Sequence, residues 1–143
     1  MQLSRETRVI AGITLLAVPT FRYGGITLLG ILTTGTAGMP PVGPALDDTQ
    51  WALFRAGHAH AGVWLVFSLV LQIVLDSATL PPGLKWLARI SAPLAAVGIS
   101  GGFFGIAFLP GFRWLLYSGA ALLAVAVILA GVGLLRRPSG EAC

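Results

Sequence analysis

Long apolar segments alternate with short polar connections along the whole chain. Four such segments cover about residues 9–32, 52–75, 84–109 and 112–135. Each one exceeds the ~20 residues that a helix rising 1.5 Å per residue needs to cross ~30 Å of hydrocarbon. Their length and number predict an all-α, integral membrane four-helix bundle that forms a single transmembrane domain over residues 1–143.

The connections between the predicted spans differ in length. Residues 76–83 and 110–111 are short, and they require the spans that they join to run antiparallel. Residues 33–50 are longer, rich in Gly and Pro, and contain Asp47 and Asp48. We expect this longer connection to fold over the membrane surface as a lid or cap.

Basic residues and tryptophans mark the ends of the predicted spans. One side of the predicted bundle collects most of the basic residues: Arg5, Arg8, Lys85, Arg89, Arg136 and Arg137. Because cytoplasmic connections are enriched in Lys and Arg, this bias predicts that both termini are cytoplasmic. Trp51, Trp86 and Trp114 each stand at the start of a span, where an indole prefers the headgroup boundary.

The composition agrees with a membrane protein and argues against a nucleic-acid partner. The chain is 56% hydrophobic and only 10% charged, which is too little charge to cover the surface of a soluble domain. The formal net charge of +4 comes from Lys and Arg scattered around apolar segments. We therefore expect contact with membrane lipid and no nucleic acid.

The second predicted span carries ionisable residues that are unusual inside a membrane. Residues 55–62 read Arg-Ala-Gly-His-Ala-His-Ala-Gly, and they include His58 and His60. Histidine binds haem iron, copper or zinc and can transfer protons, and the small neighbours let a helix or a flat cofactor approach the backbone. The motif therefore indicates cofactor or proton chemistry, although a lone histidine can also simply form a hydrogen bond between helices.

Helix geometry limits what the two histidines can bind. Residues two apart are separated by ~200° around a helix axis, so His58 and His60 cannot bind one metal ion from the same helix. A zinc site would need further ligands at matching depth, and the lone Cys143 excludes a c-type haem attachment. What remains is a single histidine ligand to a large cofactor such as haem, with the sixth position open or weakly filled. An oligomer could bring the second histidine toward a neighbour's site.

Arg22 and Tyr23 lie at the same predicted depth as the histidines. With a cytoplasmic N-terminus, the first span rises ~20 Å before Arg22 and so reaches the outer half of the membrane. Arg22 or Arg55 could pair with a cofactor carboxylate such as a haem propionate, or extend to lipid phosphate.

The third predicted span also carries a distinctive motif near its end. Residues 100–105, Ser-Gly-Gly-Phe-Phe-Gly, suit either a flat pocket wall or close helix packing. We expect all the unusual polar residues to lie in the outer half.

Two short motifs and the helix layout resemble a known enzyme family. Residues 51–62 resemble the start of the second helix in styrene oxide isomerases, small four-helix membrane proteins in which a Trp precedes Arg-Ala-His-small-Gly. They are closer still to a Phe-Arg-Ala-Gly-His-Ala-His-Ala-Gly motif of actinobacterial membrane proteins. The Gly-Phe-Phe at residues 102–104 is similar to the family's Gly-Phe-Tyr. The family's Tyr thus falls on Phe104, and an Asn expected six residues after the ligand falls on Val66.

The resemblance implies a homo-trimer that binds haem b near its subunit interfaces through one axial histidine. Aligning on His-small-Gly makes His60 the iron ligand and puts His58 where the family has Arg. Ferric haem in the family acts as a Lewis acid that binds an epoxide oxygen and opens the ring toward a benzylic cation. A 1,2-hydride shift then gives the aldehyde.

The resulting expectation is a haem b-dependent isomerase in the cytoplasmic (inner) membrane of a bacterium, acting on a small hydrophobic epoxide. The candidate catalytic residues are His58, Tyr23 and Phe104. The candidate cofactor-binding residues are His60, His58, Arg22, Arg55 and Gly62. Two non-enzymatic interpretations stay open: a haem-binding, electron-transfer or metal- or proton-handling subunit, and a purely structural membrane subunit.

Overall fold

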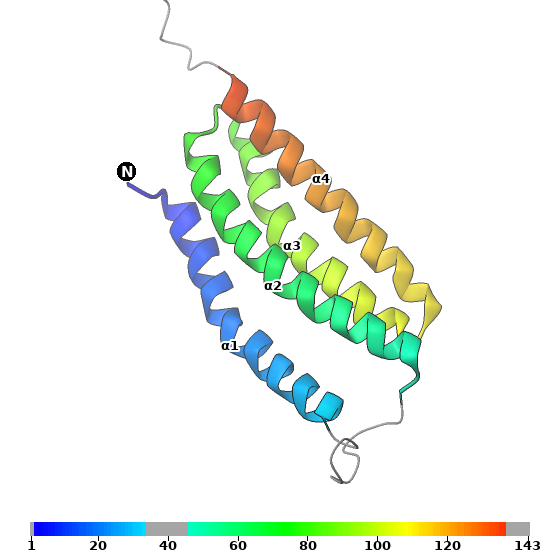
Figure 1. The fold of residues 1–143 in the computed structure, drawn as a ribbon. Coiled ribbons are helices and arrows are strands. Elements are labelled where there is room, and N and C mark those ends of the chain that lie inside the picture. The colour runs from blue at the N-terminus through cyan, green and yellow to red at the C-terminus, as the bar shows by residue number, and fades with distance from the viewer. Residues whose placement is uncertain (1, 34–45, 137–143) are drawn as a thin grey trace, which may run out of the picture.

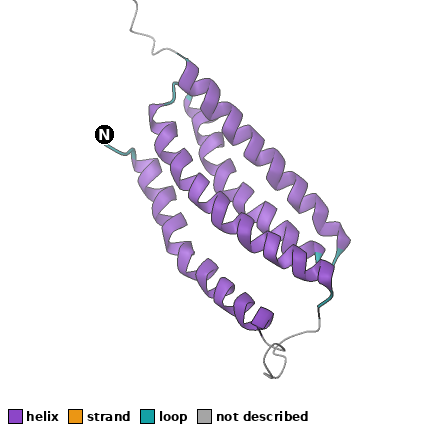
Figure 2. Ribbon diagram, viewed as in Figure 1, coloured by secondary structure: helices purple, strands orange, loops and turns teal. Residues whose placement is uncertain are grey.

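The computed structural model of the chain describes residues 2–33 and 46–136. Its elements are α1 (Arg5–Thr33), α2 (Asp48–Ser77), α3 (Pro82–Ile106), a short 3-10 turn η1 (Pro110–Phe112) and α4 (Arg113–Leu135) (Figure 1). The described residues contain no β-strand (Figure 2). The prediction of an all-α fold is therefore confirmed for the described residues, and all four long helices are long and apolar enough to cross a membrane, which is compatible with a multi-pass membrane bundle.

α2 begins earlier than the predicted residue 52, because a capping box precedes it. The Asp47 carboxylate accepts a hydrogen bond from the backbone N–H of Gln50 at 2.8 Å, and the Asp47 N–H donates to Gln50 Oε1 at 3.0 Å. Gln50 Nε2 also donates to the Ala107 carbonyl at 2.8 Å, which fastens the start of α2 to the end of α3. The predicted lid falls mostly on residues 34–45, which lie outside the described residues.

α3 is the central helix of the bundle and packs against both α2 and α4. Its contact with α4 depends on glycine. A Cβ atom added to Gly119 would lie 2.7 Å from the Ile99 backbone nitrogen, and one added to Gly102 would lie 2.6 Å from Leu116 Cβ. Glycine at these positions therefore allows the two backbones to approach closely, which is one of the two roles predicted for residues 100–105.

α1 is the peripheral helix, packed mainly against α2 and with most of its side chains exposed. It continues without a break through Pro19, and it bends near its middle (Figure 1). Proline explains the bend, because it removes one backbone hydrogen bond of the helix. The start of α1 and the end of α4 lie at the same end of the bundle, as the antiparallel order requires (Figure 1).

Candidate functional site

His58 and His60 lie on different faces of α2, as the helix geometry predicted. His58 faces α1, where a Cβ atom added to Gly25 would lie 2.6 Å from His58 Cε1. His60 faces α3, where its ring centroid lies 4.7 Å from that of Phe103. The two imidazoles therefore serve separate environments, and within one chain they do not form a common site.

The ring of His60 is oriented by its own helix. Nδ1 lies 2.8 Å from the Ala56 carbonyl oxygen, one helical turn earlier. Because a carbonyl oxygen only accepts hydrogen bonds, this contact requires the proton on Nδ1, so the neutral imidazole has its lone pair on Nε2. The Phe103 ring lies against the imidazole at a 36° tilt, with Trp64 beyond at 6.4 Å. His60 is half-buried, and a ring whose Nδ1 is bound in this way offers its Nε2 as a ligand for a metal.

His58 lies between two apolar cavities that separate α1 from α2. One cavity measures ≈ 370 Å³ and the other ≈ 630 Å³, and the His58 side chain lines both. Gly25 makes this placement possible, because any side chain there would overlap the imidazole. Cavities of this size are typical of sites for small ligands.

The smaller cavity brings the three candidate catalytic residues together. His58, Tyr23 and Phe104 all contribute to its walls. The Phe104 ring is held in place by Phe54, whose ring centroid lies 5.4 Å away, and by Gly57, where an added Cβ would lie 3.0 Å from Phe104 Cε1. The glycine of the Arg-Ala-Gly-His motif therefore makes room for an aromatic wall from α3.

The larger cavity contains two of the candidate cofactor-binding residues in addition to His58. Arg22 and Gly62 line it, and so does Val66. Arg55 is exposed and belongs to neither cavity. Arg22 is thus the basic residue that shares a cavity with a histidine.

The chemistry of His60 suits a haem ligand, but the other predicted cofactor-binding residues do not all lie near His60. The free Nε2 of His60 fits an axial ligand. In residues 2–33 and 46–136, no three His, Cys, Asp or Glu side chains cluster around a possible metal position. Within one chain, however, Arg22 and His58 lie on the α1 side of α2 and do not surround His60.

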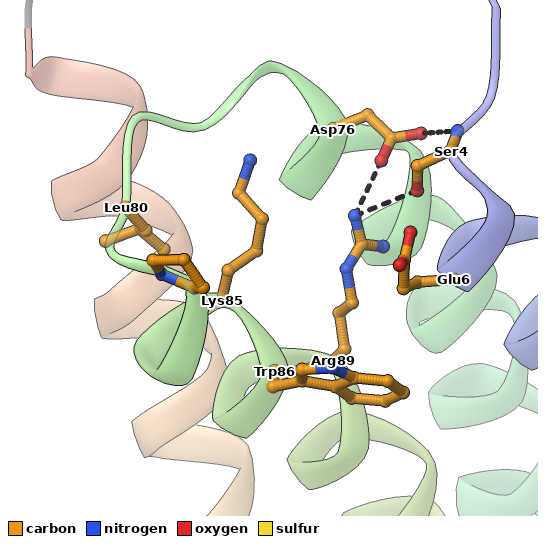
Figure 3. A pocket seen from close by; sticks show the side chains of 8 residues that line it. Ser4, Glu6, Asp76, Leu80, Lys85, Trp86 and Arg89 are labelled. Atoms are coloured by element: carbon orange, nitrogen blue, oxygen red, sulfur yellow. Dashed lines mark hydrogen bonds and ion pairs between the residues drawn. The ribbon is translucent and has the colours of Figure 1, made fainter.

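A buried polar cluster at the opposite end of the bundle was missed by the sequence analysis, which placed all the unusual polar residues near the histidines. Arg89 is only 3% exposed, and its guanidinium lies 2.6 Å from Asp76 Oδ1 (Figure 3). The same guanidinium donates to the hydroxyls of Ser4 and Thr7 and to Gln72. Arg89 therefore forms a buried ion pair and joins α1, α2 and α3. From the sequence we counted it only as one of the basic residues on one side of the bundle.

Pro93 explains why Gln72 belongs to this cluster. A proline inside a helix cannot donate to the carbonyl four residues earlier, which here is the carbonyl of Arg89. Gln72 Nε2 donates to that carbonyl instead, at 2.9 Å. The available signal in the sequence was the pair Gln72 and Asp76, which stand one turn apart in an otherwise apolar stretch of α2.

Neither a protein-family model, nor a curated protein, nor a solved structure matches this chain.

Proposed function

We propose that the chain is a haem b-dependent isomerase of a bacterial inner membrane, with both termini cytoplasmic, that converts small hydrophobic epoxides to carbonyl compounds. The observation that carries the proposal is the state of His60. Its Nδ1 lies within hydrogen-bond distance of the Ala56 carbonyl, so a neutral imidazole keeps its lone pair on Nε2, and the residue is only half-buried. This arrangement is typical of histidines that bind haem iron, because a backbone acceptor fixes the ring and its tautomer.

Assembly into a ring of identical subunits accounts for the separation of His60 from the cavities. A closed ring uses heterologous contacts, in which one face of a subunit meets a different face of its neighbour. His60 and the α1–α2 cavities lie on two such faces of α2. In the homo-trimer that the family resemblance implies, Arg22 and His58 of one subunit would complete the site built on His60 of the next.

The side chains of this chain suit the parts of the reaction that a protein must supply. Ferric haem, when bound, supplies a Lewis acid for an epoxide oxygen. Arg22 would pair with a haem propionate, as guanidinium groups do with carboxylates. Phe104 and the apolar walls beside it would keep water from a bound epoxide, which would favour rearrangement over hydrolysis to a diol.

His58 and Tyr23 are the two ring side chains with polar atoms that would orient the substrate. Both line the smaller cavity, and each can donate a hydrogen bond to an oxygen atom of a bound molecule. Val66 and Phe104 stand where the family has polar side chains, so His58 and Tyr23 would take over that role here.

The reaction itself provides the test. Purified, haem-loaded protein incubated with styrene oxide should form phenylacetaldehyde, measured by gas chromatography. The His60→Ala protein should form none above the rate of free haem, and Tyr23→Phe should retain haem while it loses activity. Formation of the diol, or equal rates with the His60→Ala protein, would overturn the proposal.

The position of His58 favours electron transfer as a second candidate function. Its imidazole faces open cavity space, so in a ring assembly it could approach the haem on the neighbour's His60 and fill the sixth coordination position. The protein would then be a haem-binding electron-transfer subunit without Lewis-acid activity. A low-spin, six-coordinate spectrum that becomes high-spin in His58→Ala would support this function over the isomerase.

A further inference from the structure

The end of the bundle opposite the histidines contains another cavity, between the start of α1, the end of α2 and the start of α3. It measures ≈ 380 Å³, and its charged walls are Glu6, Asp76, Lys85 and Arg89 (Figure 3). Two acids and two bases balance, so the cavity is formally neutral although it is strongly polar. None of these residues takes part in the proposed isomerase site.

Of the four charged residues in this cavity, two form an ion pair and two do not. Arg89 and Asp76 neutralise each other at 2.6 Å, and this is the one ion pair within residues 2–33 and 46–136. Glu6 and Lys85 line the same cavity but form no ion pair there. Figure 3 shows them on opposite sides of the Arg89 guanidinium. The cavity thus offers one carboxylate and one ammonium group that are separated from each other and without a charged partner.

An apolar groove lies between α1 and α3, about one helical turn from this cavity. The groove measures ≈ 370 Å³ and is lined by Ile10, Ile13, Thr14, Ile90, Pro93 and Leu94. Ile10 lies one turn beyond Glu6 on α1, and Ile90 lies one turn beyond Trp86 on α3, so cavity and groove share the same helix faces. The Thr14 hydroxyl donates to the Ile10 carbonyl at 2.8 Å, which leaves the groove without a free polar side chain.

We infer that this end of the bundle binds one glycerophospholipid whose head group carries a primary ammonium beside its phosphate. Lys85 would pair with the phosphate, Glu6 would accept hydrogen bonds from the ammonium, and one acyl chain would lie in the groove between α1 and α3. Trp86, a wall of the cavity that is 49% exposed, stands where indoles prefer the headgroup region. The formal neutrality of the cavity matches a zwitterionic head group better than an anionic one.

Native mass spectrometry after extraction from vesicles tests this site. The vesicles contain equal amounts of phosphatidylethanolamine, phosphatidylglycerol and phosphatidylcholine, and the bound lipid is identified by its mass. We expect one phosphatidylethanolamine per chain, retained about fivefold better than either of the other lipids, as one interfacial charge contact allows. Equal retention of the three lipids, or a preference for phosphatidylglycerol, would overturn the inference.

Substitutions separate the head group from the acyl chain. Glu6→Gln should abolish the preference for the ammonium lipid, and Lys85→Gln should weaken retention of phosphatidylethanolamine about fivefold. Ile90→Trp should fill the groove and prevent retention. Asp48→Asn and Arg113→Gln remove one charge of each sign from the opposite end of the bundle, and they should leave retention unchanged. Retention in Glu6→Gln and Lys85→Gln that equals that of the controls would contradict the site.

Soluble competitors distinguish the whole lipid from its head group. Phosphoethanolamine and inorganic phosphate should not displace the bound lipid at millimolar concentration, because neither fills the groove. Displacement by either would overturn the role of the acyl chain. A dimer that carries no lipid and is cross-linked through cysteines placed at Ile13 and Ile90 would show instead that a second copy covers the groove. These measurements need no haem, so their outcome is independent of the isomerase proposal.

Discussion

At the scale of single residues, His60 and His58 differ in what their ring nitrogens can do. His60 has its Nδ1 bound to the Ala56 carbonyl, so its orientation and tautomer are fixed before any metal arrives. His58 instead faces the cavities, packed over Gly25. The first environment suits a permanent ligand, whereas the second suits a group that meets a substrate or a neighbouring subunit.

Asp76 has a structural role that a single substitution can test. Asp76→Asn removes the charge that balances the buried Arg89 guanidinium, so it should lower the free energy of unfolding by about 3–5 kcal/mol. Asp48→Asn, on an exposed residue at the other end of α2, should change it by no more than ~0.5 kcal/mol. Unfolding in mixed micelles, followed by circular dichroism, measures both values.

The double substitution Asp76→Leu with Arg89→Met tests whether the unpaired charge of Arg89 causes this loss of stability. It removes both charges and should recover most of the stability that Asp76→Asn loses, because no unpaired charge stays buried. An Asp76→Asn protein as stable as the Asp48→Asn control would show that the ion pair does not hold α1, α2 and α3 together.

At the scale of helices, glycine sets the distance between α3 and α4. Gly119→Leu places a side chain against the backbone of Ile99, which cannot move aside, and should destabilise the protein by about 1–3 kcal/mol. Gly131→Leu lies on the same helix, where an added Cβ meets no atom within 4 Å, and should be tolerated. Thermal unfolding of the two proteins in detergent compares them directly, and equal melting temperatures would refute the close packing.

The helices themselves were predictable from the sequence, whereas their mutual placement was not. Hydrophobic length alone locates the spans, because a membrane helix must satisfy its backbone hydrogen bonds internally. The opposite directions of His58 and His60 also follow from the 100° advance per residue. Which neighbouring helix each histidine faces depends on how α1 and α3 pack around α2. For the same reason the sequence could not show that Arg89 meets Asp76 and Thr7.

At the scale of the whole molecule, the proposed site requires more than one subunit. His60 and the cavity that holds Arg22 and His58 open on different faces of α2, so an isolated chain presents two half-sites. Most side chains of α1 are exposed, and this apolar surface is available for contact between subunits. Function in this account depends on assembly.

Mixed oligomers test that dependence. The His60→Ala chain keeps an intact cavity, and the Tyr23→Phe chain keeps an intact haem ligand, so each homo-oligomer should be inactive. Co-assembly of the two should restore a measurable fraction of the epoxide isomerisation, because some interfaces then combine both intact halves. Mixed oligomers, verified by mass spectrometry, that are as inactive as their parents would show that the two halves do not cooperate.

The absorption spectrum of the purified protein shows whether His60 holds haem b. We expect a Soret band with about one haem per chain in the unaltered protein, retained in His58→Ala and lost in His60→Ala. Circular dichroism should show equal helix content in all three proteins. A colourless protein after reconstitution with haem, or a Soret band that survives in His60→Ala and disappears in His58→Ala, would contradict this expectation.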